Sequence, residues 1–158
     1  MAEMSIEYIN PFLVAAGSVL QTACNIQLKA GKPYVRTNSF DENSVVICLG
    51  ITGQLGGQVI IAFNKTVALE LASKMCMMEL TTLDELSISA LSELGNMVLG
   101  NAATVLSTKN VIIDITPPVL IQGNFQMQSA YSKNICIPMT YDDIKLIELD
   151  ISFTEVAQ

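Results

Sequence analysis

The residues with the clearest potential for chemistry lie on one face of a helix that the sequence predicts over residues 84–108. At about 100° per residue, a narrow stripe of this helix is polar or small. A carboxylate in the stripe can pair with a cation, and an amide can both donate to and accept from a water molecule. From spacing alone, ordinary solvated side chains explain the pattern better than a site does. The stripe consists of Ser89, Glu93, Asn96 and Gly100, extended at its ends by Glu85 and Ala103.

The composition excludes many other mechanisms. The chain of 158 residues contains no histidine. It has 15 acidic and 8 basic residues, which give a net charge of −7. Without histidine there is no Ser-His-Asp triad, no Cys-His dyad and no imidazole metal ligand. The acidic excess argues against binding to a nucleic-acid backbone. An enzyme of this composition must use carboxylates, amides or hydroxyls, or borrow chemistry from a partner.

Other acidic and glycine-rich groups give weaker indications of a site. The pairs Asp142-Asp143 and Glu148/Asp150 suggest a cation site, but no loop of alternating oxygen ligands with a glycine surrounds them. We therefore predict solvated turn and strand residues. A glycine cluster between two predicted strands favours a hairpin turn over a phosphate-binding loop. Its members are Gly53, Gly56 and Gly57.

The sulfur-containing residues and the apolar runs favour a cytoplasmic protein. The cysteines are widely separated, which predicts buried thiols in a reducing cytosol and no metal ligands. We expect three methionines near residue 76 to fill the core, with an adaptable partner surface as the alternative. The longest apolar runs have the length of strands, and the first residues lack the basic region of a signal peptide, so we expect no membrane segment. The residues concerned are Cys24, Cys48, Cys76, Cys136, Met75, Met77 and Met78.

The hydrophobic pattern predicts the elements that position the stripe. The apolar side of its helix, which includes Leu91, Leu94 and Val98, suits packing on a sheet. Asn10 and Pro11 are typical of a helix start. Helices are predicted over 10–25, 66–78 and 84–108, and strands over 44–51, 57–63, 111–121, 125–130, 134–140 and 145–153.

A weak internal repeat suggests how these elements are arranged. A shift of 86 residues brings Glu7 and Asn10 onto Glu93 and Asn96. We predict one α+β domain spanning residues 1–158, a pseudo-two-fold repeat of a helix plus antiparallel strands, with long helices packed on one continuous sheet.

An ordered set of motifs resembles the CheC/CheX/FliY family, most closely its CheX-like members. These proteins are phosphatases of the phosphorylated chemotaxis response regulator CheY. The resemblance covers nearly the whole chain. Its motifs are Asn10-Pro11-Phe12, Ala30-Gly31-Lys32-Pro33, the segment 50–57, Leu83-Asp84-Glu85-Leu86, Ser89 with Ser92-Glu93-Leu94-Gly95-Asn96-Met97, and Asp114-Ile115-Thr116-Pro117-Pro118.

The resemblance implies a catalytic role for two residues of the stripe. Asn96 would position the attacking water, and Glu93 would pair with a lysine of a CheY-type receiver that supplies its own Mg²⁺. Ser89, Gly95 and Gly100 would meet the partner, although packing within the protein explains the two glycines equally well. Pro117 and Pro118 would lie near the site. The family also implies a homodimer. The alternatives are a non-catalytic adaptor and a phosphatase of a receiver outside chemotaxis.

The first predicted helix departs from some relatives, which carry a second E-x-x-N there. Since Pro11 sets the helix start at Asn10, we expect Glu7 to precede the helix. Glu7 then shares no helical face with Asn10, so we expect Asn10 to be a cap and the protein to have a single site. A second site at Glu7 and Asn10 is the alternative.

Overall fold

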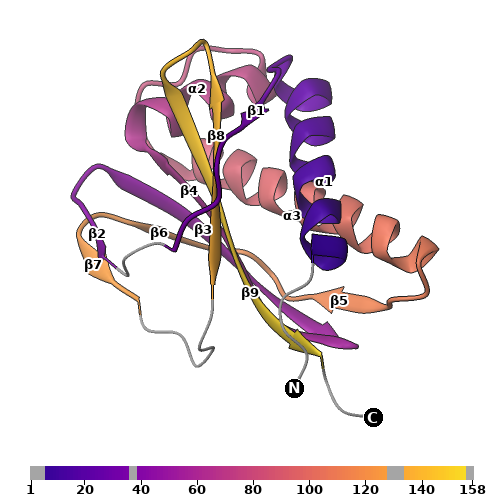
Figure 1. The fold of residues 1–158 in the computed structure, drawn as a ribbon. Helices are drawn as coiled ribbons and strands as arrows, with labels where there is room; N and C mark the ends of the chain where they lie inside the picture. Colours follow the sequence, from indigo (N-terminus) through magenta and orange to yellow (C-terminus); the bar gives the residue numbers. More distant parts are fainter. Residues whose placement is uncertain (1–5, 36–38, 128–133, 156–158) are drawn as a thin grey trace.

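The computed structural model describes residues 6–35, 39–127 and 134–155, in which three helices cover one face of a seven-stranded sheet (Figure 1). The helices are α1 (Ile6–Cys24), α2 (Lys65–Cys76) and α3 (Glu85–Thr108). The sheet contains β1 (Lys29–Ala30), β3 (Ser44–Gly53), β4 (Leu55–Asn64), β5 (Ile113–Ile115), β6 (Val119–Gln122), β8 (Ile135–Tyr141) and β9 (Lys145–Glu155). A separate two-stranded ribbon pairs β2 (Ser39–Phe40) with β7 (Phe125–Gln126).

The strand order contains the predicted two-fold repeat. The main path is β1-β8-β9-β4-β3-β5, with β6 on the same edge of β3 as β5, and every pairing is antiparallel. The 86-residue shift carries β2 onto β7, and β3 and β4 correspond to β8 and β9. The same shift carries β1 onto β5. On the main path, β1, β8 and β9 on one side of the sheet therefore correspond to β5, β3 and β4 on the other side, with β4 and β9 paired at the centre. This confirms the α+β fold with helices on one continuous antiparallel sheet.

The alternation of side chains along the strands determines which face is covered. Val45 and Ile47 of β3 pack under the helices, whereas Val46 faces the other side and packs with Phe40 of the β2–β7 ribbon. The ring of Phe40 stacks on that of Phe125, with centroids 4.7 Å apart. The three helices thus lie on one side of the sheet and the small ribbon lies on the other.

The start of α1 corrects the prediction for the first helix. The helix begins at Ile6, so Pro11 lies inside it. The proline removes one hydrogen bond near the amino terminus, to the carbonyl of Glu7. Packing extends the helix beyond this point, because the ring of Tyr8 lies edge-on to that of Phe153 at 5.9 Å and Ile9 is buried. Glu7 is therefore helical, contrary to the sequence prediction.

The strand predicted over 111–121 is also corrected. It is split into β5 and β6 by Thr116-Pro117-Pro118. The break is held against β3, since the Gly50 amide donates to Oγ1 of Thr116 at 2.8 Å and the Thr116 amide donates to the Gly50 carbonyl at 3.0 Å. The predicted strand over 125–130 is reduced to β7, and residues 128–130 lie outside the described part of the chain.

Candidate active site

Helix α3, which carries the stripe, begins at a strong cap. Oδ1 of Asp84 accepts hydrogen bonds from the backbone amide of Ser87 at 3.0 Å and from its hydroxyl at 3.1 Å. The bond from the backbone amide, followed by the one from the hydroxyl, lowers the pKa of the Asp84 carboxyl. Since Ser87 is buried, the first turn of the helix is fixed to the protein interior. The cap therefore sets where α3 starts and which face it turns outward.

The predicted stripe lies on the outer face of α3. Ser89 and Glu93 are exposed, and Asn96 and Gly100 are half-buried. On the opposite side Leu91, together with Leu94, Val98 and Ala102, is buried against the sheet and the other helices. The sequence thus correctly placed the carboxylate and the amide on one accessible face.

Neither functional group of the pair is used to hold the fold together. Among the described residues, the side chains of Glu93 and Asn96 make no hydrogen bond or ion pair with one another or with any other residue. The only charged residues of α3 are Glu85 and Glu93, so no lysine or arginine on this helix competes for the carboxylate. The face offers a free carboxylate and a free amide about one helical turn apart to an outside molecule.

The two glycines of α3 have different environments. A Cβ at Gly95 would lie 2.9 Å from Cγ2 of Ile47 and 3.2 Å from Cδ1 of Leu49, both on β3. Gly95 is buried, and its missing side chain lets α3 pack closely on the sheet, as the packing alternative predicted. That Gly95 meets a partner stays a prediction. A Cβ at Gly100 would meet nothing within 4 Å. A glycine inside a helix costs about 1 kcal/mol relative to alanine, and no packing within the described protein accounts for this cost at Gly100.

The proline segment lies beside the part of β3 that supports α3. Val119, which follows Pro118, pairs with Cys48 on β3, next to the residues that contact Gly95. Pro117 is exposed and Pro118 is half-buried. Because Thr116 is hydrogen-bonded to Gly50, the segment stays attached to the edge of β3 with which β5 and β6 pair.

A second carboxylate–amide pair lies on α1, where the sequence prediction did not place one. Because the helix starts at Ile6, Glu7 and Asn10 stand three residues apart on it, and both are exposed. The signal that could have found this pair was the 86-residue repeat, which superimposes it on Glu93 and Asn96.

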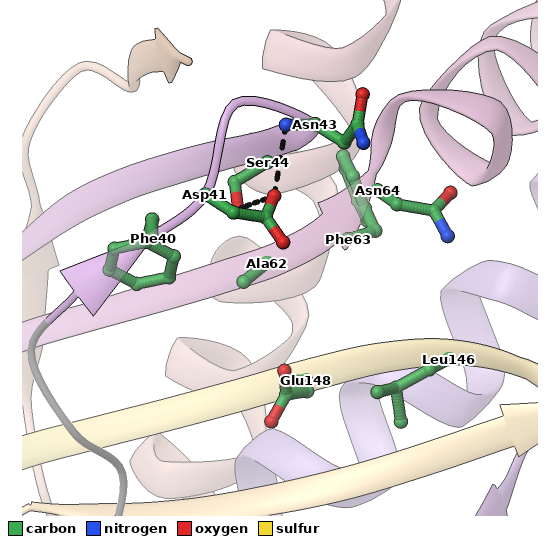
Figure 2. Close-up of a pocket in the computed structure, with 9 residues that line it drawn as sticks. All are labelled: Phe40, Asp41, Asn43, Ser44, Ala62, Phe63, Asn64, Leu146 and Glu148. Atoms are coloured by element: carbon green, nitrogen blue, oxygen red, sulfur yellow. Dashed lines mark hydrogen bonds between the residues drawn. The ribbon is translucent and has the colours of Figure 1, made fainter. Parts of the chain in front are cut away.

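The polar pocket in Figure 2 lies away from both helical pairs, on the side of the sheet that faces the β2–β7 ribbon. Its volume is about 330 Å³. Two of its polar side chains have structural roles: Asp41 accepts from the Asn43 amide and the Ser44 hydroxyl, and Asn64 caps α2 through the Val67 amide. Its lining residues are Phe40, Asp41, Asn43, Ser44, Ala62, Phe63, Asn64, Leu146 and Glu148.

The acidic residues near the carboxyl terminus differ in part from the prediction. Asp142 and Asp143 are exposed turn residues with positive φ, as expected for a tight turn. Asp150, however, is only 6% exposed and accepts both hydrogen bonds of the Asn134 amide at 3.1 Å, so it is no solvated strand residue. Burial, and then the charge of Asp150, raise the pKa of Glu148. Within the described ranges no group of three potential metal-binding side chains is present.

The cysteine and methionine predictions hold only in part. Cys24 and Cys136 are buried, whereas Cys48 and Cys76 are half-buried. Burial raises the pKa of the Cys24 thiol to about 11. Met75 packs against the core, whereas Met77 and Met78 are 92% and 54% exposed. The two exposed methionines follow the end of α2, where the αL conformation of Met77 terminates the helix.

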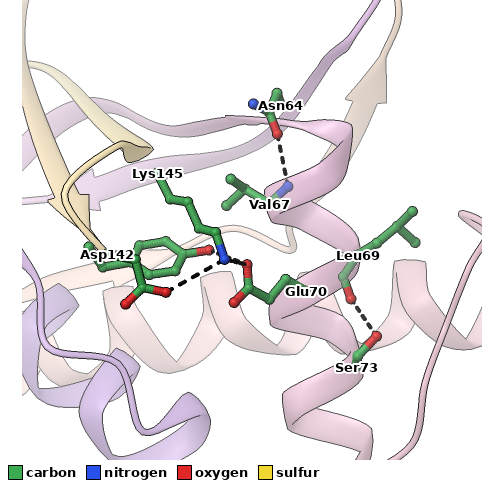
Figure 3. Close-up of polar contacts among 8 residues, drawn as sticks. Asn64, Val67, Leu69, Glu70, Ser73, Asp142 and Lys145 are labelled. Atoms are coloured by element: carbon green, nitrogen blue, oxygen red, sulfur yellow. Dashed lines mark hydrogen bonds and ion pairs between the residues drawn. The ribbon is translucent and has the colours of Figure 1, made fainter.

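A polar cluster that the sequence did not reveal fixes α2 to the β8–β9 turn (Figure 3). Glu70 accepts hydrogen bonds from Nζ of Lys145 at 2.8 Å and from the Tyr141 hydroxyl at 3.0 Å. Burial works against the charge on Glu70, but these two bonds outweigh it and lower the pKa of the carboxyl. Burial and the bond to Glu70 raise the pKa of Tyr141. The cluster is structural, and it holds the helix that packs beside α3.

Comparison with known protein families gives a match over more than half of the chain. A family model described as chemotaxis phosphatase CheX matches residues 45–140. The chain belongs to the CheX family. CheY-P phosphatase CheX of Thermotoga maritima is 30% identical over 150 residues, which are 94% of this chain and 97% of the relative.

Solved structures of CheX proteins share the fold over nearly their whole length. A chemotaxis protein CheX from Desulfovibrio desulfuricans has a TM-score of 0.84 at 25% identity, covering 94% of this chain and 99% of the other. The CheX–CheY–BeF3–Mg complex of Borrelia burgdorferi has a TM-score of 0.81 at 34% identity, covering 96% and 100%. Among the described residues, no helix is long and apolar enough to cross a membrane.

Proposed function

We propose that this CheX-family protein hydrolyses the aspartyl phosphate of a CheY-type response regulator on the exposed face of α3. The observation that carries the proposal is the free pair Glu93 and Asn96, one helical turn apart on the family's fold. The Borrelia relative at 34% identity was solved with CheY, BeF3 and Mg, which supports both the partner and the source of the metal.

In this proposal the Asn96 side chain holds the attacking water. Its carbonyl oxygen accepts from the water, and this contact turns the water's lone pair toward phosphorus. The new P–O bond forms as the bond between phosphorus and the partner's aspartate oxygen breaks. The aspartate leaves as a carboxylate, and the water's proton leaves with the phosphate product or passes to solvent. Phosphoryl transfer depends mainly on such positioning and on charge stabilisation, so a neutral amide is sufficient.

Glu93 docks the partner in this proposal. Its exposed carboxylate has no ion-pair partner among the described residues and would pair with a lysine next to the receiver's phosphorylated aspartate. Helices α1 and α3 contain no lysine or arginine, so this surface attracts a cationic group without an internal competitor. Mg²⁺ would come with the receiver and neutralise phosphoryl charge there.

The deciding experiment follows loss of phosphoryl label from a phosphorylated CheY-type receiver in the presence of Mg²⁺. Wild type should accelerate the loss, and Asn96→Ala should remain folded and bind the receiver but lose most of the acceleration. Equal rates with and without wild type, despite binding, would instead identify an adaptor. Acceleration only with receivers outside chemotaxis would change the substrate and leave the reaction as proposed.

We further propose that the protein is a cytoplasmic homodimer. The mean hydropathy of +0.46 and exposed apolar side chains such as Ile144, at 85%, support an interface between subunits. Light scattering measures the molar mass directly, and a value of one 17.1 kDa chain would contradict the dimer.

A further inference from the structure

Gly100 is a residue of the α3 stripe whose identity neither backbone conformation nor packing within the described protein explains. Its φ is not positive, so no special backbone conformation requires glycine. A Cβ there would meet nothing within 4 Å, so no close packing requires glycine either. Its carbonyl accepts from the Thr104 hydroxyl at 3.1 Å, a bond that any residue at position 100 could make.

The two-fold repeat provides a direct comparison for this position. The 86-residue shift that brings Asn10 onto Asn96 brings Val14 onto Gly100. Val14 is 61% exposed, which shows that a branched side chain at this place on the helix is compatible with the fold. The missing side chain at Gly100 therefore leaves free the surface one turn beyond Asn96, about 6 Å along the helix axis.

We propose that Gly100 is a docking residue, over which the backbone of the phosphorylated receiver passes next to its phosphorylation site. The inference rests on the proposed function and extends the contact from Glu93 and Asn96 toward the carboxyl end of α3. The occupant is a receiver with a lysine opposite Glu93 and an uncharged, closely packed segment opposite Gly100, because α3 carries no charged residue between Glu93 and its end. A side chain at Gly100 would hold this segment away and misplace the phosphoryl group relative to Asn96.

Gly17 offers a matched control on α1. It lies within the helix, it is half-buried, and a Cβ there also meets nothing within 4 Å. Both Gly100→Ala and Gly17→Ala should therefore raise Tm by about 2–4 °C, since alanine favours the helix. Only Gly100→Ala should weaken docking.

The experiment measures two quantities for wild type, Gly100→Ala, Gly100→Val and Gly17→Ala. The first is Tm, and the second is Kd for the receiver loaded with BeF3⁻ and Mg²⁺, together with kcat/KM for dephosphorylation. We expect Kd to rise about 10-fold for Gly100→Ala and further for Gly100→Val, with kcat/KM falling in parallel, and both to stay at the wild-type values in Gly17→Ala.

A Gly100→Ala protein with a raised Tm and wild-type Kd and kcat/KM would overturn the inference. So would an equal loss of affinity in Gly17→Ala, since the effect would then follow from helix propensity. An inactive wild type would refute the proposed function instead. In that case Kd still tests the docking contact separately.

Discussion

Helices α1 and α3 carry the same pair of side chains on equivalent faces, yet their surroundings differ. Glu7 and Asn10 occupy the positions of Glu93 and Asn96 in the two-fold repeat. Asn96 is half-buried, whereas Asn10 is exposed. A carboxylate and an amide at the right spacing are thus not enough to distinguish a site.

The supporting residues under the two pairs differ most. Between Glu93 and Asn96 lies Gly95, which lets α3 approach β3, while the equivalent residue on α1 is the buried Ile9. One turn beyond the pair stands Gly100 on α3 and the exposed Val14 on α1. Gly95 thus lets α3 pack closely on the sheet, and at Gly100 the outer face of α3 has no side chain where α1 carries Val14. The following predictions test this difference.

The largest effect is expected for the two asparagines. Asn96→Ala should lower the catalysed rate of phosphate release by about 100-fold, because the attacking water loses its orientation. Asn10→Ala should leave the rate unchanged. Single-turnover dephosphorylation of the receiver measures both. An equal loss in the two variants would mean that α1 carries a second functional site.

The two glutamates should differ in partner affinity. Glu93→Gln should raise Kd for the BeF3⁻-loaded receiver by about 10- to 30-fold, since the receiver's lysine would be buried without its counter-charge. Glu7→Gln removes the same charge from α1 and should leave Kd for the receiver unaltered. Isothermal titration at two salt concentrations checks this. An unchanged Kd in Glu93→Gln would remove the docking role assigned to Glu93.

The residues below the pairs should separate stability from activity. Gly95→Ala forces a methyl group against Ile47 and should destabilise the fold by about 1–3 kcal/mol. Ile9→Val on α1 should cost about 1 kcal/mol by removing one buried methyl group. Chemical denaturation gives both values. Only Gly95→Ala should also lower kcat/KM, because it displaces the helix that carries Asn96. Equal kcat/KM values for Gly95→Ala and Ile9→Val would contradict a role of Gly95 in positioning Asn96.

The smallest effect concerns the cap of α3. The lowered pKa of Asp84 means that its carboxylate stabilises the folded state above the ordinary aspartate pKa, and that this contribution is lost as the pH falls through the folded-state pKa. Asp84→Asn should keep the cap at neutral pH, since asparagine caps equally well, and should flatten the acid dependence of Tm. Thermal unfolding from pH 7 to pH 3 tests this. Parallel curves for both proteins would exclude Asp84 as a source of the acid dependence.

The sequence predicted those features that depend on local spacing. The stripe of α3 follows from the helical period, and its start at Asp84 follows from cap chemistry. The hairpin of β3 and β4 was found because two β-rich runs flank a glycine-containing turn, where Gly53 has φ +102°. Each of these elements is determined mostly by neighbours in the chain.

Features that depend on distant residues were missed. The early start of α1 depends on Tyr8 meeting Phe153 from the other end of the chain. The environments of Gly95 and Gly100 depend on whether a strand packs against each of them, and no helical pattern contains that information. The burial of Asp150 likewise depends on its hydrogen bond from Asn134, which directly precedes the neighbouring strand β8.

The central pairing of β4 with β9 has a consequence for synthesis of the protein. Leu55 pairs with Glu155, so the middle of the sheet joins residues 100 positions apart in the chain. While the ribosome is still translating, β4 has no neighbour on that edge, and a bare hydrophobic strand edge is prone to intermolecular pairing. The sheet of the amino-terminal half therefore cannot close until β9 has been synthesised, which makes slow folding the expected behaviour of this chain in the cell.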